Sequence, residues 1–209
     1  MTSYLTTPIP ATAENNWADI ANRINEFRLR FYQAQLYLPD HPAVTLVEDF
    51  MNHRNPRRLD ISDKDTLTTD ASAYLYDVRR MDEVKIMLAA FKKIGSKATK
   101  GLPIPFARSL GAQSIGEQLK YPFQFTGELY TNTTRALLGS YDGTATPTEI
   151  GAGNMILSFE IHNPLTWESL TRFPPILGGY EGGNSYVPHI PGWEIQMTFQ
   201  WREVITLKK

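Results

Sequence analysis

The sequence predicts an α+β fold, in which a helical N-terminal half packs on a mainly antiparallel β-sheet or barrel formed by the C-terminal half. The first observation is the distribution of glycine, because all 14 glycines lie at position 95 or later. Charge follows the same division, with 27 charged residues in 1–100 and 16 in 101–209. Glycine-free, charge-rich sequence favours helices, whereas glycine-rich, aromatic sequence with little charge favours strands joined by turns.

The next observation is a long alternation of apolar and polar side chains over residues 193–207. A period of two predicts a β-strand with one apolar and one polar face, and Glu203 interrupts the alternation where a bulge is expected. At ~3.3 Å per residue such a strand spans roughly 50 Å. We therefore expect it to need partner strands from adjoining copies as well as from its own chain. The apolar positions are Trp193, Ile195, Met197, Phe199, Trp201, Ile205 and Leu207.

The length of 209 residues fits one large or two small domains. The threonine- and proline-rich residues 1–13 are predicted to form an extended arm. The remainder, 14–209, is predicted to be a single α+β domain. Within it we expect a helical part over 14–95, a connector over 96–120 and a β part over 121–209.

Three helices are predicted in the helical part, over residues 15–37, 42–53 and 70–94, of which the last is the longest. Pro42 suits the first position of the second helix. Gly95 is expected just beyond the third helix, where a left-handed residue commonly ends a helix. The apolar stripe of the first helix consists of Trp17, Ile20, Ile24, Phe27 and Phe31.

The β part shows alternation that predicts two further strands, over residues 121–129 and 154–162. Between them the dipeptide Asp142-Gly143 predicts a turn. Residues 163–192 contain five prolines and five glycines. They are predicted to end the second strand and to form a long exposed loop.

The composition excludes several classes of function. A net charge of −1 argues against a general nucleic-acid binder, which needs a basic excess. The absence of cysteine excludes disulfides, thiolate nucleophiles and cysteine-ligated metals. The N-terminal residues lack the basic and apolar segments of a secretory signal, and no apolar run reaches the ~18–20 residues of a membrane helix. We expect a protein made in the cytoplasm.

Candidate catalytic residues are few. Ser114 lies in a sequence that approximates a nucleophile elbow, and Asp142 with His162 or His189 follows in an order that a triad allows. The residues before Ser114 do not form a convincing strand, which that motif requires. The histidines lack metal-ligand spacing. We therefore predict no catalytic, metal or cofactor site and no enzymatic activity, and a serine esterase is the remote alternative.

Residues available for protein contacts form three groups: apolar side chains of the arm, a basic cluster after the second helix, and aromatic side chains of the predicted loop. The first two groups have plainer interpretations, as a floppy terminus and as solvated charge. The candidate interaction residues are Tyr4, Leu5 and Ile9 in the arm, Arg54, Arg57 and Arg58 in the cluster, and Trp167, Phe173, Tyr180 and Tyr186 in the loop.

A second basic cluster follows the third predicted helix. We interpret it as a solvated helix end, where cations suit the helix dipole; the alternative is a phosphate site. Its members are Lys92, Lys93, Lys97 and Lys100.

The segments YPFQFTGELYTNTT, GAGNMILSFEIHNP and WEIQMTFQWREVITL resemble virion proteins of the tail and neck of tailed phages, namely tube, terminator and connector components. The resemblance covers about residues 120–207 and assigns no functional residue. It implies a β-layer flanked by helix that builds homo-oligomeric rings, with loops and arms that reach neighbouring virion proteins. It also implies location in the virion, without a membrane partner or specific nucleic-acid binding.

Two hypotheses therefore stand beside the remote esterase. The first is a structural virion protein that acts by assembling into a ring or tube through inter-subunit β-sheet and arm contacts. The alternative is a β-rich binding module in which the aromatic loop 163–192 holds a small ligand or carbohydrate. The first requires a ring-sized species in solution, and the second a monomer or dimer with an aromatic cleft.

Overall fold

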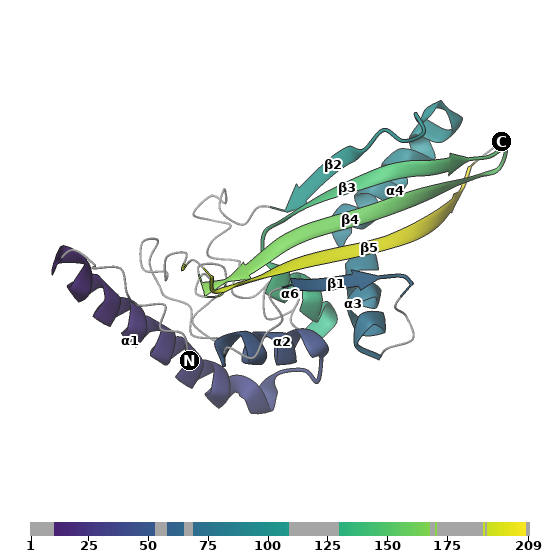
Figure 1. Ribbon diagram of the computed structural model, residues 1–209. Helices are drawn as coiled ribbons and strands as arrows, with labels where there is room; N and C mark the ends of the chain where they lie inside the picture. Colours follow the sequence, from purple (N-terminus) through teal and green to yellow (C-terminus); the bar gives the residue numbers. More distant parts are fainter. Residues whose placement is uncertain are drawn as a thin grey trace, which may run out of the picture.

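The computed structural model shows an α+β fold, with N-terminal helices followed by a five-stranded, mostly antiparallel sheet in the C-terminal half (Figure 1). This confirms the predicted fold class, and the sheet is open rather than closed into a barrel. The residues that the structure describes are 11–52, 58–64, 69–108, 130–167, 170, 190 and 192–207.

The two edge strands of the sheet are interleaved with the helices along the chain, whereas the three central strands follow one another at the C-terminal end. The helices are α1 (Ala11–Ala34), α2 (Pro42–Met51), α3 (Thr69–Arg79), α4 (Asp82–Ile94) and α6 (Thr133–Leu138), with 3₁₀ turns η1 (Gln35–Tyr37) and η2 (Gly95–Lys97). The strands are β1 (Arg58–Ser62), β2 (Ile104–Arg108), β3 (Tyr141–Ile150), β4 (Asn154–Thr166) and β5 (Glu194–Thr206). Their order in the sheet is β1-β5-β4-β3-β2, in which only β1 is parallel to its neighbour.

The predicted C-terminal strand is confirmed as β5, which is 13 residues long. Strand β4 pairs with it along its whole length, from Asn154 opposite Thr206 to Thr166 opposite Glu194. On its other edge, β1 pairs only with the part from Gln196 to Gln200. Among the residues that the structure describes, the strand is therefore paired fully on one side and only in part on the other.

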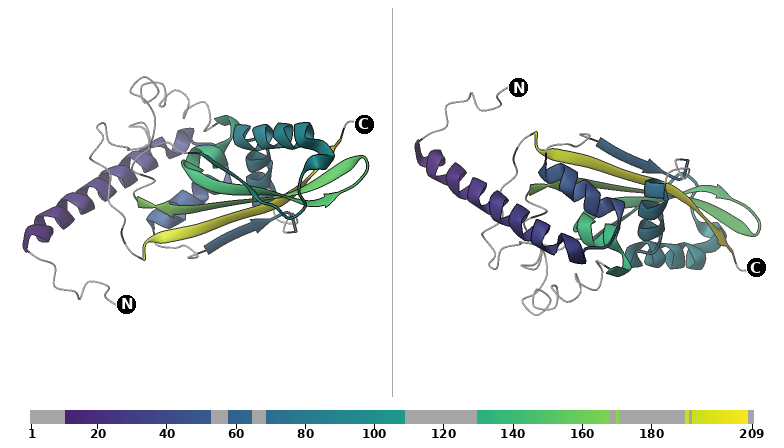
Figure 2. Two further views of the ribbon diagram at one scale, coloured as in Figure 1. Left: turned by 90° about the horizontal axis from the view of Figure 1, so that it is seen from above. Right: turned by 90° about the horizontal axis from the view of Figure 1, so that it is seen from below.

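The helices α3, α4 and α6 lie behind the sheet in Figure 1, and the face toward the viewer is open; Figure 2 shows the same layers from above and below. Alternate side chains of β4 and β5 point toward the helices and are buried. Phe159 stacks on Trp201 with ring centroids 5.0 Å apart, and Phe199 contacts Tyr74 of α3 at 5.8 Å. The core is therefore a single layer between the helices and the sheet.

The predicted bulge at Glu203 is wrong, because the register between β4 and β5 continues through it without a shift. The Glu203 side chain lies on the helix side of the sheet, and its Oε1 is 3.0 Å from Nε of Arg79 on α3. The acid replaces an apolar residue there because it has a cation to pair with.

The N-terminal helix begins earlier than predicted, because residues 11–13 are helical rather than part of an extended arm. Its last predicted residues, 35–37, form the 3₁₀ turn η1. With 24 residues, α1 is also the longest helix of the described part of the chain, a position that the sequence assigned to 70–94.

The predicted helix over 70–94 is wrong as a single element, because it divides into α3 and α4 at Met81. Met81 has extended backbone, with φ −61° and ψ 143°, yet its side chain is fully buried, like those of Val78 and Val84. The apolar stripe therefore continues through the break and conceals it. Asp82 and Glu83 begin the second helix, where acids suit the helix dipole. Gly95 ends it with φ 60°, as predicted.

Two predicted boundaries in the β part are also wrong. Asp142 and Gly143 lie inside β3 rather than in a turn, because the Phe106 ring packs where a side chain at Gly143 would be; a Cβ there would be 2.5 Å from Phe106 Cζ. Pro164 lies inside β4. The backbone nitrogen of Pro164 points toward the side of β3. Strand β3 does not extend as far as Pro164, so the missing N–H removes no hydrogen bond of the ladder.

Strand β2 lies in the predicted connector over 96–120. Strand β1 lies in a segment with no predicted element. The predicted strand over 121–129 is outside the described residues.

A half-buried ion pair fastens the helices to the sheet. Nη2 of Arg135 on α6 donates to Oε1 of Glu83 on α4 at 3.0 Å, and the Tyr141 hydroxyl of β3 donates to the other oxygen at 2.8 Å. Burial alone would raise the pKa of Glu83, but the hydrogen bonds from Arg135 and Tyr141 bring it below its usual value. The carboxylate is therefore held charged among three elements.

Phe199→Ala should lower the free energy of unfolding by about 3–5 kcal/mol, because a buried aromatic side chain leaves a cavity. Urea unfolding followed by circular dichroism measures it. The matched control is Gln196→Ala on the opposite face of the same strand, with an expected change within about 0.5 kcal/mol. Equal effects of the two substitutions would contradict the assigned faces of β5.

Candidate interaction surfaces

Most of the candidate interaction residues lie outside the described part of the chain. Their predicted roles therefore stay predictions. These residues are Tyr4, Leu5, Ile9, Arg54, Arg57, Phe173, Tyr180 and Tyr186. Ser114 of the esterase hypothesis also lies outside it.

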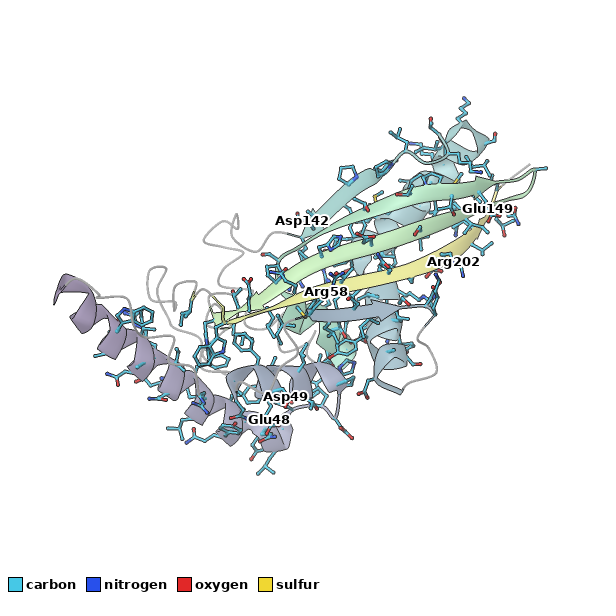
Figure 3. All side chains as sticks on the ribbon, viewed as in Figure 1. Glu48, Asp49, Arg58, Asp142, Glu149 and Arg202 are labelled. Carbon is cyan, nitrogen blue, oxygen red and sulfur yellow. The ribbon has the colours of Figure 1, made fainter. Side chains whose placement is uncertain are left out.

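Arg58 is the first residue of β1 and its side chain is exposed. Its Nε lies 2.7 Å from Oδ2 of Asp60. Figure 3 shows Arg58 on β1, the strand at the lower edge of the sheet, about midway along the length of the sheet. The guanidinium is therefore available at the surface, but one carboxylate already partly neutralises it.

Trp167 does not lie in an exposed loop, so that prediction is wrong. It directly follows β4 and its side chain is fully buried. Its ring packs against Phe27 of α1 at 6.1 Å, Phe50 of α2 at 5.1 Å and Trp193 at 5.6 Å. This indole fixes the two N-terminal helices to the sheet, and it has no exposed ring face for a ligand.

The open face of the sheet is polar. Asp142 and His162 are register partners across β3 and β4, and His162 is in turn opposite Thr198 of β5. Glu160 contacts the His162 ring and accepts a hydrogen bond from Gln200 at 2.8 Å. The structure thus brings together the acid and one histidine of the suggested triad. Within the described residues, no group of three acidic or histidine side chains is arranged to hold a metal ion.

Among the described residues, the end of β5 has an outer edge without a backbone partner, which we call the open β5 edge and define as Glu203–Thr206. Asp63 N–H donates to Gln200 O at 3.0 Å, and Asp63 Oδ2 accepts from Arg202 N–H at 3.1 Å, so β1 and its turn cover the strand up to this point. Leu207 N–H donates inward, to Gly153 O. Since successive amides alternate, the backbone groups of Val204 and Thr206 point outward.

Val204 is the most exposed large hydrophobic side chain of the described sheet, at 66%. It lies at the centre of the open β5 edge, on the polar face. An unpaired edge that carries an apolar side chain is a template for pairing with another strand. The sequence predicted that this strand needs partners beyond its own chain, but it does not indicate which of its residues have an open edge.

The opposite side of the sheet is less able to pair. Gly101 N–H donates to Pro147 O at 2.8 Å and covers the edge of β3 beyond β2. This bond shows that the backbone groups of odd-numbered residues of β3 point toward β2. Pro105 is the register partner of the even-numbered Thr144, so its backbone points outward, away from β3. Pro105 has no N–H to donate, which blunts that edge.

A polar junction joins α2, α3 and α6. His41 caps α2, because its Nδ1 accepts from Ala43 N–H at 3.1 Å, and its Nε2 lies 3.4 Å from Oδ2 of Asp77. Asp77 is buried on α3 and accepts from Thr134 N–H of α6 at 2.7 Å. Asn132 caps α6 and donates to Asp77 O at 2.8 Å. The sequence signal for this junction is a histidine directly before the helix-starting proline.

The pKa of His41 is lowered, chiefly because burial disfavours the imidazolium. The nearby carboxylates Asp77, Asp40 and Asp70 oppose that shift. With Nδ1 accepting a hydrogen bond, the neutral ring carries its proton on Nε2, toward Asp77. Protonation of Nδ1 would remove the helix cap.

No protein-family model, curated protein or solved structure matches the chain. Among the described helices, none has the length and apolarity to cross a membrane. Among the described surfaces, the open β5 edge has the clearest unmet bonding capacity.

The lowered pKa of His41 predicts that the native state loses stability in acid. The neutral form is favoured in the folded state, so this stabilisation is present above the unfolded pKa of about 6.5 and is lost as pH falls through the lower folded pKa. Thermal unfolding between pH 8 and pH 5 measures the slope. His41→Asn keeps a capping side chain that does not titrate, and should flatten the slope over this window.

The matched control is Gln196→Ala on the open face of the sheet, which removes no titrating group, leaves His41 in place and should keep the wild-type slope. If His41→Asn retained the full slope, the acid sensitivity would not come from the junction.

Proposed function

We propose that this protein is a structural component of a phage-like virion, of the tail or neck, which assembles into a ring or tube through β-sheet contacts between copies. The observation that carries the proposal is the open β5 edge. Its outward backbone groups at Val204 and Thr206 have no partner among the described residues, and a strand of a neighbouring copy supplies one by strand addition.

The asymmetry of the sheet restricts strand addition to one side, so the added strand comes from a part of the neighbour other than its β2 edge. The β2 side is blunted by Pro105 and covered at Pro147, whereas on the β5 side the described cover ends at Arg202. Natural sheets block the edges that must stay free, for example with proline. The contrast favours use of the open β5 edge in assembly.

Helix α1 offers a second contact. It extends beyond the sheet at the end opposite the C-terminus (Figure 2), and its inner face is buried through Ile20, Phe27 and Phe31. Its other side and the following turn expose Leu29 and Leu36, the latter at 91%. Apolar side chains on a projecting helix suit the predicted contacts between subunits.

On this proposal the protein acts through assembly rather than catalysis, its partners are further copies and neighbouring virion proteins, and its location is the virion. The aromatic-loop hypothesis gains no support from Trp167, the one residue of its set within the described part of the chain, because that ring is buried.

Val204→Pro should abolish assembly while the subunit stays folded. The Val204 N–H points away from β4, so proline removes no hydrogen bond of the ladder and should cost about 1 kcal/mol or less. Light scattering coupled to size exclusion measures the mass, with a ring-sized species expected for wild type and a monomer for the variant.

Val204→Lys provides a second test that keeps the N–H and adds an edge charge, with the same expected loss of assembly. The matched control is Thr146→Lys on the same face of β3, which should assemble like wild type. A wild-type protein that stays monomeric at high concentration would contradict the proposal.

A further inference from the structure

The described molecule has one strongly basic end. From Val84 to Arg108 the chain carries six cationic residues and no acid. Four of them lie at the end of α4 and in the turns that follow, all exposed; Figure 1 places this region beside the C-terminal end of β5. The helix dipole accounts for the lysines in the last turn of α4, but not for those beyond it. We define the basic end as Lys92, Lys93, Lys97 and Lys100.

An acidic patch lies around α2 and the start of α3. Asp40 and Asp70 both act electrostatically on His41, and Asp70 and Asp49 act on Tyr74, so the three carboxylates share one region. The chain from Phe31 to Asn52, which contains α2, has three acids and no lysine or arginine. We define the acidic patch as Asp40, Asp49 and Asp70.

Neither group is neutralised within the described structure. No lysine of the basic end and no carboxylate of the acidic patch has an ion-pair partner within 4 Å among the described residues. Lys85 is different, because it pairs with Asp82 at 3.1 Å.

The two groups lie far apart on the molecule. Asp70 is in the first turn of α3, whereas the basic end closes α4, so the length of both helices separates them. Helix α3 packs near β1 at one edge of the sheet, and α4 packs near β2 at the other. Complementary surfaces at opposite ends of one subunit generate head-to-tail contacts, which close into rings or continue as helices.

We propose that the basic end of one copy docks on the acidic patch of the next, and that this heterologous contact sets the direction of the assembly. The inference rests on the proposed function and adds the direction in which successive copies are arranged. Exposed ion pairs contribute little affinity each, but complementary patches orient the encounter and exclude the reversed arrangement.

A second copy fits the basic end better than a nucleic acid does. Binding of duplex DNA depends on many neutralised phosphates and on an overall basic surface, and this chain has a net charge of −1. The same chain also supplies a patch of opposite sign. A DNA-binding measurement nevertheless separates the two partners.

The experiment reverses each group and then both. One variant carries Lys97→Glu with Lys100→Glu, the other Asp40→Lys with Asp70→Lys; all four positions are exposed. Each should raise the concentration at which half of the protein is assembled at least about tenfold, because like charges then face each other. The variant with all four substitutions, or a mixture of the two, should restore assembly. Circular dichroism confirms folding, and Asp142→Lys on the open sheet face is the control.

Rescue by the combined reversal supports the proposed contact, because only a direct pairing of the two groups predicts it. Wild-type assembly should also weaken between 50 and 500 mM salt, that is, over a roughly tenfold range that shortens the screening length from about 14 to 4 Å. Assembly that persists unchanged in both variants overturns the head-to-tail contact and leaves the proposed function standing. A monomeric wild type overturns both. Binding of a labelled DNA duplex that is lost on Lys97→Glu with Lys100→Glu, with assembly unaffected, overturns the contact in favour of nucleic acid.

Discussion

The pairing of β4 with β5 is the constraint on which the rest of the structure depends. Thirteen residues of each strand face each other without a register shift, and every second residue points into the core. A slip by one residue would turn the entire apolar series of β5 toward solvent. Because both strands alternate in the same phase, Phe159 can stack on Trp201 and the helices find one continuous apolar surface.

The same pairing creates the unsatisfied edge. A strand of 13 residues is longer than the five-residue β1 that covers its other side. Asp63 terminates that cover by bonding Gln200 and Arg202, and beyond it the backbone has no described partner. The length that makes the ladder with β4 strong is therefore also the length that leaves β5 open toward a neighbour.

The parts of the fold that follow from local pattern were predictable, and those that depend on distant contacts were not. The alternation around Phe199 identifies β5 because one face of the strand is apolar and the other is polar over most of its length. The break at Met81 is hidden because its side chain is buried at the spacing that a continuous helix would give. Gly143 and Pro164 are residue types that are typical of turns, yet both lie in strands. The Phe106 ring packs against Gly143, and Pro164 lies beyond the end of β3, where its missing N–H breaks no ladder hydrogen bond.

The candidate interaction residues also depend on distant contacts that the local sequence does not show. Proline and glycine around Trp167 suggested an exposed loop, yet the indole fills the space between α1, α2 and the sheet. No local pattern distinguishes a tryptophan that binds a ligand from one that closes a core. The junction of His41 with Asp77 joins positions 36 residues apart in the sequence, and its members become recognisable only when the helices are placed.

Charge and hydrogen bonding have complementary roles in the assembly that we propose. Long-range attraction between the basic end and the acidic patch orients two copies before they touch, because it acts over about a Debye length. Backbone hydrogen bonds at the open β5 edge act only at contact, but they fix the register. Figure 1 places this edge and the basic end at the same end of the molecule. A neighbour drawn to the lysines therefore arrives where the strand needs a partner, and one encounter can satisfy both.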